Sequence, residues 1–155
     1  MKELESRARV RGDLEIIVTD AEGKRVSRFA LKNTITYNGI TGILRLLMAD
    51  SAASWEINAL KAGTNGVPPT RGDTALGASV ITKSVTGASR VLSASTGTLV
   101  FQAQIGPAEA TGVVLREAGL FFANNVMFSR MTHPEIDRTV AGFGVLYIWR
   151  LTFTV

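Results

Sequence analysis

Cysteine is absent from the 155 residues, and histidine occurs once, at His133. Without cysteine the chain forms no disulfide and no thiolate metal site, and it has no cysteine nucleophile. A zinc site needs three or four His, Cys or carboxylate ligands, so one imidazole excludes a standard structural site and disfavours a catalytic one. We therefore predict no metal, no cofactor and no catalytic residue, in a protein made in a reducing cytoplasm.

Charged residues are also scarce, at 19% of the chain against 46% hydrophobic residues, where soluble domains average about 25% charged. No apolar run approaches the roughly 18 residues of a membrane span, and the first 15 residues lack the apolar stretch of a signal peptide. We expect a protein that is soluble as made, with no membrane partner. Its shortage of charge indicates either a large core or apolar surface that a partner covers, and we favour the partner.

The formal charge of +4 raises nucleic acid as a partner. Basic residues gather near the N-terminus, at Lys2, Arg7, Arg9 and Arg11, but Glu3, Glu5 and Asp13 lie among them. The remaining basic residues are scattered, without a basic helix or interleaved aromatic residues. The pattern favours a solvated face over a nucleic-acid surface. Nucleotide binding has no support either, because no Gly-rich phosphate-binding motif occurs among the 15 glycines.

The first 13 residues are charged and show no periodicity, so we expect residues 1–13 to form a flexible arm or one ordered by a partner. Residues 14–155 should form a single domain. Its first element is a hairpin, in which the β-branched run Leu14 to Thr19 turns back through residues 20–23. Leu14, Ile16 and Val18 share one face of that strand.

The apolar period then changes from two to about 3.6, which predicts one short helix over residues 39–50, with Asn38 as its N-cap. Its apolar positions, expected to pack across a sheet, are Ile40, Ile43, Leu44, Leu47 and Met48.

The rest of the chain alternates with period two, which predicts strands. The Ser/Thr-rich run from residue 78 breaks at Thr86-Gly87, and Asn124-Asn125 predicts a type I′ hairpin. In the last strand, alternate residues from Val145 to Val155 are all large and apolar, which indicates a central core strand. The fold class is therefore mainly β, an antiparallel β-sandwich with one short helix, with a closed barrel as the alternative.

Candidate acid–base residues are few. His133 precedes a proline, so we expect an exposed loop histidine, although a hydrolase that uses His133 with Asp137 or Glu135 remains a hypothesis. No Gly-x-Ser-x-Gly motif accompanies it. Glu109 is a further candidate carboxylate, and Glu117 is unusual because apolar residues surround it in a strand. We expect an ion pair of Glu117 with Arg116, Arg130 or Arg150.

Two weaker signals concern binding. Arg-Gly-Asp occurs at residues 11–13 and 71–73, and both copies are better explained as local turn chemistry than as adhesion motifs. Gln102 and Gln104, with the Ser/Thr-rich strands, could form a polar face for sugar. Such faces usually carry exposed aromatic residues, for which only Trp55 and Tyr37 remain open.

The segment LKAGTNGVPPTRGDTAL, residues 60–76, predicts an ordered surface connection, since glycines and Pro68-Pro69 impose turns and an extended path. Its Leu-x-x-Gly, Pro and Asp-Thr-x-Leu spacing resembles small virion structural proteins of tailed bacteriophages. Further segments resemble the same family in the same order: residues 14–26, Lys32 to Thr36 leading into the helix, Arg116 to Phe121 before VMFSRM, and residues 144–155.

The resemblance covers residues 14–155 and implies a non-enzymatic, mainly β subunit of the tail, collar, baseplate or fibre attachment. Such a subunit is synthesised in the host cytoplasm, is located in the virion, and forms a homo-oligomeric ring or trimer that docks on other virion proteins. The alternative is a lectin-like module that binds glycan in a receptor-binding apparatus. The resemblance brings no catalytic residues.

Overall fold

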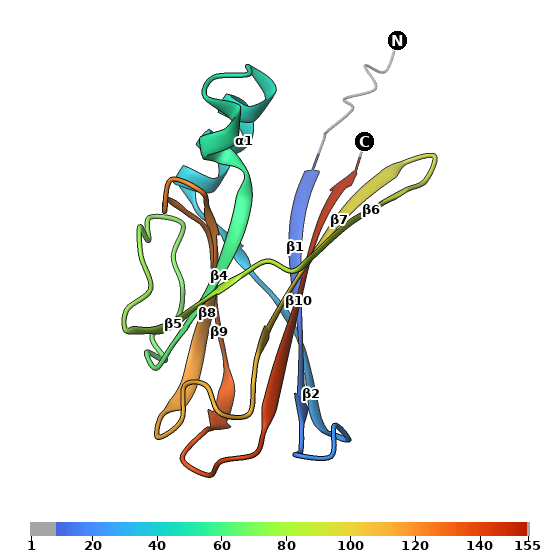
Figure 1. Ribbon diagram of the computed structural model, residues 1–155. Helices are drawn as coiled ribbons and strands as arrows, with labels where there is room; N and C mark the ends of the chain where they lie inside the picture. The colour runs from blue at the N-terminus through green and yellow to red at the C-terminus, as the bar shows by residue number, and fades with distance from the viewer. Residues whose placement is uncertain (1–8, 155) are drawn as a thin grey trace.

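The computed structural model describes residues 9–154, which form two stacked antiparallel sheets of five strands each (Figure 1). We call them sheet A, in the order β2-β1-β10-β7-β6, and sheet B, in the order β3-β9-β8-β4-β5. The predicted β-sandwich is confirmed, and the closed barrel is wrong because each sheet has two free edges. The strands are β1 (Arg9–Thr19), β2 (Arg25–Lys32), β3 (Thr34–Ile35), β4 (Ile57–Gly63), β5 (Ser79–Ser84), β6 (Gly87–Leu92), β7 (Thr96–Ile105), β8 (Val114–Phe122), β9 (Met127–Asp137) and β10 (Gly144–Thr154).

The predicted central core strand is confirmed, since β10 is the middle strand of sheet A. Its alternate residues turn inward, and Tyr147 and Trp149 are fully buried. On the neighbouring β1, Leu14, Ile16 and Val18 are buried as their alternation predicts. The core between the sheets is completed from sheet B by side chains such as Leu60, Leu115, Leu120, Phe122 and Phe128.

The predicted arm is wrong for residues 9–13, because β1 begins at Arg9 and pairs with β10 from Arg9↔Thr154 onward. Residues 9–13 therefore belong to sheet A. Residues 1–8, the rest of the expected arm, lie outside the described residues. The alternation in residues 9–13 is hard to see because Gly12 occupies an inward position, where its Cα faces the Asn33 side chain. Arg11 and Asp13, on the outward face, form an ion pair of 2.9 Å.

The α-helix in residues 9–154 is α1 (Tyr37–Leu47), which begins and ends earlier than residues 39–50. Its N-cap is Thr36 and not Asn38. The Thr36 hydroxyl accepts a hydrogen bond from the Gly39 amide at 2.9 Å and donates to the Met127 carbonyl at 2.9 Å. Thr36 thus satisfies the helix N-terminus and ties it to β9 at the same time. A short 3-10 helix, η1 (Ala52–Trp55), follows.

Two turns position the later strands. The break predicted at Thr86-Gly87 is the crossing between sheets, since β5 is an edge of sheet B and β6 an edge of sheet A. The Asn-Asn turn is not type I′, because among its residues only Asn125 has a positive φ, 67°. The Asn125 amide donates to the Phe122 carbonyl and the Phe122 amide to the Val126 carbonyl, which is the three-residue loop with one left-handed position.

Candidate functional site

His133 is buried in β9, not exposed in a loop as expected. Pro134 continues the strand, and the imidazole turns into the sandwich, where Nε2 lies 3.4 Å from the Tyr147 hydroxyl. Nδ1 lies 2.8 Å from the Pro134 carbonyl, so Nδ1–H donates there and Nε2 accepts from the tyrosine. Burial lowers the pKa of His133 and raises the pKa of Tyr147. The pair is a neutral bridge between the sheets.

The other expected members of a hydrolytic site have different partners. Asp137 accepts hydrogen bonds from the Thr139 amide and hydroxyl, which lower its pKa. Glu135 is exposed and pairs with Arg116 at 2.7 Å. Glu109 pairs with Lys83 and accepts from the Gly106 amide. Within residues 9–154 no group of three His, Cys, Asp or Glu side chains is placed to hold a metal ion. The geometry therefore gives the hydrolase hypothesis no assembled site.

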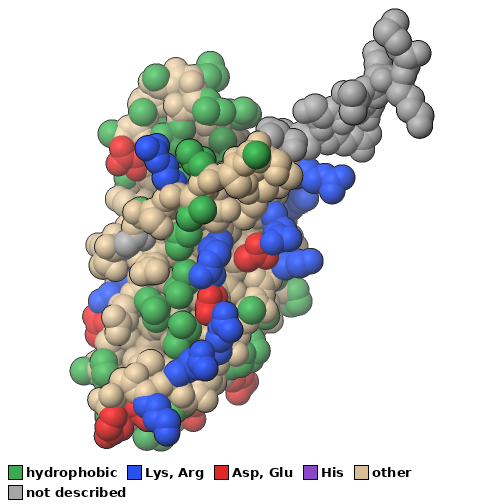
Figure 2. Space-filling view, turned by 90° about the vertical axis from the view of Figure 1, so that its right-hand side faces the viewer, with side chains coloured by type: hydrophobic (Ala, Val, Ile, Leu, Met, Phe, Trp, Pro, Cys, Tyr) green, Lys and Arg blue, Asp and Glu red, His purple; other side chains and the backbone are tan. Residues whose placement is uncertain are grey.

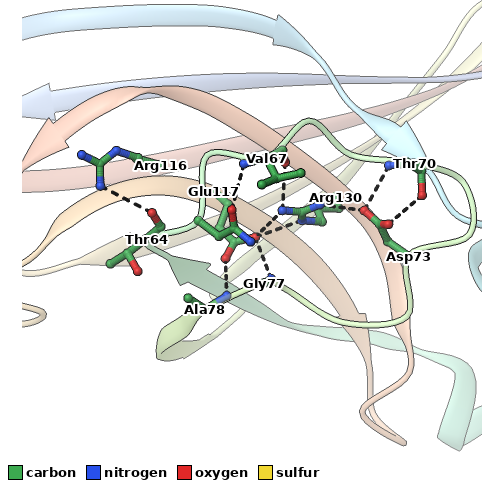
Figure 3. Close-up of polar contacts among 10 residues, drawn as sticks. Thr64, Val67, Thr70, Asp73, Gly77, Ala78, Arg116, Glu117 and Arg130 are labelled. Atoms are coloured by element: carbon green, nitrogen blue, oxygen red, sulfur yellow. Dashed lines mark hydrogen bonds and ion pairs between the residues drawn. The ribbon is translucent and has the colours of Figure 1, made fainter.

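Glu117 forms the ion pair expected of it, with Arg130, at 2.9 Å (Figure 3). Its side chain is fully buried, and both carboxylate oxygens are engaged: Oε1 accepts from the Ala78 amide at 2.7 Å, and Oε2 from the Gly77 amide and Arg130. Arg130 also donates to Asp73 at 2.7 Å and to the Val67 carbonyl at 3.1 Å. We call these groups the loop anchor, since they fix residues 64–78 to β8 and β9.

Two members of the loop anchor, Asp73 and Arg130, have shifted pKa values. Burial alone would raise the pKa of Asp73, but hydrogen bonds from Thr70 and the pair with Arg130 outweigh it and lower that pKa. Burial would likewise lower the pKa of Arg130, and the two carboxylates outweigh it and raise that pKa. Both oxygens of Glu117 have hydrogen-bond partners, so the loop anchor acts as a brace that positions residues 64–78.

The loop anchor also explains the conformation of the second Arg-Gly-Asp copy, residues 71–73. The Asp73 carboxylate turns back onto the Thr70 hydroxyl at 2.6 Å and onto Arg130, as the turn explanation predicts. For the first copy the turn explanation is wrong, because residues 11–13 lie inside β1, where Arg11 pairs with Asp13. The carboxylates of both aspartates, Asp13 and Asp73, are therefore already bound to other groups of this chain.

The polar face expected for sugar lies on sheet A. Gln102 and Gln104 are exposed on β7, opposite Ile148 and Leu146 of β10. Trp55 does not stand beside them, because its ring packs edge-on against Phe122 of sheet B, at 5.2 Å between centroids, with Arg45 over it. The other aromatic left open, Tyr37, is exposed on α1.

The outer face of sheet A carries many charged side chains of both signs (Figure 2). Glu15 on β1 pairs with Arg28 of β2 at 2.6 Å and with Arg150 of β10 at 2.9 Å. The hydrogen bond from Arg28 is the main cause that lowers the pKa of Glu15. Basic side chains outnumber carboxylates on this face, but Arg11, Arg28 and Arg150 are each paired with Asp13 or Glu15.

The most unusual surface is apolar and lies on α1. Apolar side chains at spacings of three and four residues form an exposed stripe, with Leu47 80% and Met48 77% exposed. We call this stripe the α1 ridge: Tyr37, Ile40, Leu44, Leu47 and Met48. The sequence predicted four of these five as the packing face, which is wrong. Ile43 does pack on the sheets as predicted, together with Gly39, Gly42 and Leu46, because the glycines let α1 approach Phe122 and Phe128 closely.

An apolar hollow of about 360 Å³ adjoins the α1 ridge, with Leu47 in both. Its walls come from both sheets and from α1: Ile43, Leu46, Leu47, Ile57, Leu99, Phe101, Phe122, Phe128, Leu151 and Phe153. Hydrophobic side chains gather at this end of the molecule in Figure 2. We call the α1 ridge and the hollow together the apolar end. Exposed apolar patches of this kind mark interaction surfaces.

Comparison with protein-family models, with curated proteins and with solved structures gives no match. Within residues 9–154, no helix has the length and apolar character needed to cross a membrane.

Proposed function

We propose that this chain is a non-enzymatic structural subunit of a tailed-phage virion, in the tail, collar, baseplate or fibre attachment, and that it assembles through its apolar end. The order of sequence motifs motivates the virion assignment. The observation that carries the assembly role is the α1 ridge, where Leu44, Leu47 and Met48 are each more than half exposed. Exposure of such side chains to water is unfavourable, so each one contributes to the free energy of association when a partner buries it.

The fixed orientation of α1 supports a role for the α1 ridge in assembly, because the exposed ridge is not the result of a loosely packed helix. α1 already packs on the sheets through Gly39, Gly42, Ile43 and Leu46, and its N-terminus is fixed by Thr36. The helix is thus held in place while its second apolar face points outward. The one basic residue of its last turn, Arg45, is paired with Asp50 at 2.7 Å and lies over Trp55. A partner that covers the α1 ridge therefore meets apolar side chains and needs to neutralise no free charge there.

Two measurements test this function. Sedimentation velocity on the full chain should give an oligomer that Leu44→Lys and Met48→Lys dissociate, with unchanged circular dichroism. Val67→Lys is the matched control, because Val67 is 62% exposed but lies in the loop of residues 64–78. A monomer at micromolar concentration, or equal effects of all three variants, would contradict assembly through the apolar end. Immunogold electron microscopy of particles from the encoding phage tests the virion assignment, and unlabelled particles would contradict it.

A lectin-like glycan-binding module is a second candidate, and one observation favours it. A cleft of about 270 Å³ lies beside the exposed ring of Tyr37, with Asn33, Lys32 and Arg71 among its lining residues. Sugar sites combine an aromatic face with amide and cationic donors. A glycan array probed with the wild type and with Tyr37→Ala checks this candidate. Signals that Tyr37→Ala abolishes would favour it, and a silent array would remove it.

A further inference from the structure

The four free edges of the two sheets differ in how they resist pairing with another chain. An exposed edge strand is normally blunted by charge, bulges or short length. The β2 edge carries Arg25, Arg28 and Lys32 and has a register shift at Val18/Thr19. The β3 edge has two residues, and the β5 ladder is interrupted between Ala62 and Gly63. The β6 edge is regular: within the described chain, its ladder with β7 runs in register from Gly87 to Leu92.

The register of β6 shows which of its main-chain groups face outward. The Ser93 amide donates to the Thr96 carbonyl at 2.8 Å, so Ser93 and Thr96 are a hydrogen-bonded pair. Hydrogen-bonded pairs recur at every second residue of an antiparallel ladder, which assigns Val91 and Ser89 to the same class. The N–H and C=O groups of Ala88, Arg90 and Leu92 therefore point away from β7, towards the free edge of sheet A.

The side chains of β6 are as accessible as its edge. Val91 is 61% exposed on the outer face and Leu92 74% on the inner face. A hollow of about 420 Å³ is lined by Arg90, Leu99 and Phe101, among others, on the inner face of the β6–β7 hairpin. Figure 1 shows this hairpin projecting beyond the rest of sheet A, away from sheet B. An apolar inner sheet face thus extends past the layer that would cover it.

We propose that β6 pairs with β6 of a second copy of this chain, antiparallel about a two-fold axis at Val91. A two-fold axis at Arg90 would place the two Arg90 side chains directly opposite each other, and like charges in that position are destabilising. With the axis at Val91, Arg90 faces Leu92 of the second copy. Arg90 and Leu92 are then hydrogen-bonded partners in both directions, and each such pair exchanges two main-chain bonds.

The remaining pairs in this register also match. Val91 faces Val91 of the second copy, which is a β-branched pair on the outer face, and Ser89 faces Ser93, which can share a hydrogen bond. The edge thus pairs with itself in main chain and side chain and places no like charges directly opposite each other, as an interface around a two-fold axis allows. The inference names the partner within the proposed assembly role but uses a different surface from the apolar end.

Cysteine crosslinking tests the register directly, because the chain has no cysteine of its own. Two Val91→Cys chains would place their Cα atoms about 4.5 Å apart, as a non-hydrogen-bonded pair, within the range of a disulfide. Ser89→Cys is the matched control: its Cα atoms would be offset by four residues, about 13 Å. Under mild copper–phenanthroline oxidation we expect covalent dimer from Val91→Cys and little from Ser89→Cys. Equal yields, or none from Val91→Cys, would overturn the proposal.

Charge placed at the axis provides a second test. Val91→Lys should weaken dimerisation at least about tenfold in sedimentation velocity, because two lysines would face each other. Val140→Lys is its control, since Val140 is 62% exposed in a loop. Unchanged dimerisation in Val91→Lys contradicts the proposal. If deleting residues 1–8 abolishes dimerisation while Val91→Cys fails to crosslink, a neighbour's N-terminal segment occupies the edge, and the proposal is wrong. If only Leu44→Lys dissociates the oligomer, the assembly role stands and the β6 pairing fails.

Discussion

The carboxylate of Glu117 on β8 and the guanidinium of Arg130 on β9 lie 2.9 Å apart on the face of sheet B that residues 64–78 cover. They lie thirteen positions apart in the chain, and together they bind main-chain groups on both sides of that loop, the Val67 carbonyl and the Gly77 and Ala78 amides. The loop therefore owes its shape to two side chains outside it.

Glu117→Gln should destabilise the fold by about 3–5 kcal/mol, because it leaves a buried guanidinium with one carboxylate fewer. Urea unfolding followed by circular dichroism measures this change. Glu135→Gln breaks the exposed pair with Arg116 and should cost less than about 1 kcal/mol. Similar losses in the two variants would show that the loop anchor contributes no more than a surface ion pair.

Stability should fall as the pH drops below about 6.5, the ordinary pKa of histidine. Burial lowers the pKa of His133 in the folded state, so below that pH the unfolded chain binds a proton that the folded chain refuses. The contribution of His133 to the free energy of unfolding is therefore fully present above about pH 6.5. As the pH falls below this value, the free energy of unfolding decreases by up to about 1.4 kcal/mol per pH unit, until the pKa of His133 in the folded state is reached.

The variant His133→Gln identifies the group responsible, because the amide keeps a polar side chain without titrating in this range. Unfolding midpoints measured between about pH 7.5 and 5.5 should slope for the wild type and flatten for His133→Gln. The carboxylates of Glu15 and Asp73 have lowered pKa values and stay ionised over this window. A slope that survives the substitution assigns the effect to another group.

Gly39→Ala should destabilise the protein although alanine is the better helix former. A Cβ at this position would lie 2.1 Å from the Phe128 carbonyl oxygen, a main-chain atom of β9 that cannot rotate away. The expected net loss is about 1–3 kcal/mol, measured as a lower Tm. In the control Gly72→Ala the nearest atom lies 3.9 Å away, so its stability should stay within about 0.5 kcal/mol of wild type.

Thr36→Ala should cost about 1–2 kcal/mol, because it removes both the cap of α1 and the bond from that cap to the Met127 carbonyl. Thr36→Ser keeps the hydroxyl and should recover most of the loss. Chemical denaturation of the two variants measures the difference. If serine is no better than alanine, the hydroxyl is not what fixes the helix.

Sequence patterns predicted the strands best where one face is buried along the whole element. In β10 the alternation through Tyr147 and Trp149 predicted both the strand and its central place. Pattern-based prediction failed for the packing face of α1, because this helix is apolar on two faces. The spacing of its glycines, and not side-chain size, determines which face packs on the sheets. The signal was available in Gly39 and Gly42, which are three residues apart and both buried.

Contacts across long stretches of sequence were less predictable. The ion pair of Glu117 was expected but with three possible partners, because strand register decides which arginine reaches it, and Gly119↔Arg130 sets that register. His133 was expected to be exposed because a residue that precedes proline usually lies in an exposed turn. Here the Pro134 position is exposed while the preceding residue turns inward, an alternation that a turn-based rule does not include.

The pairing of Arg9 with Thr154 at the start of the β1–β10 ladder has a mechanical consequence. Tension applied at these two residues would load the ladder from its end, one hydrogen bond at a time, so the strands would peel apart at low force. Tension applied at opposite ends of the two strands would load the whole ladder in shear. The sandwich therefore has a weak and a strong pulling direction, and single-molecule stretching through these two geometries would give different rupture forces.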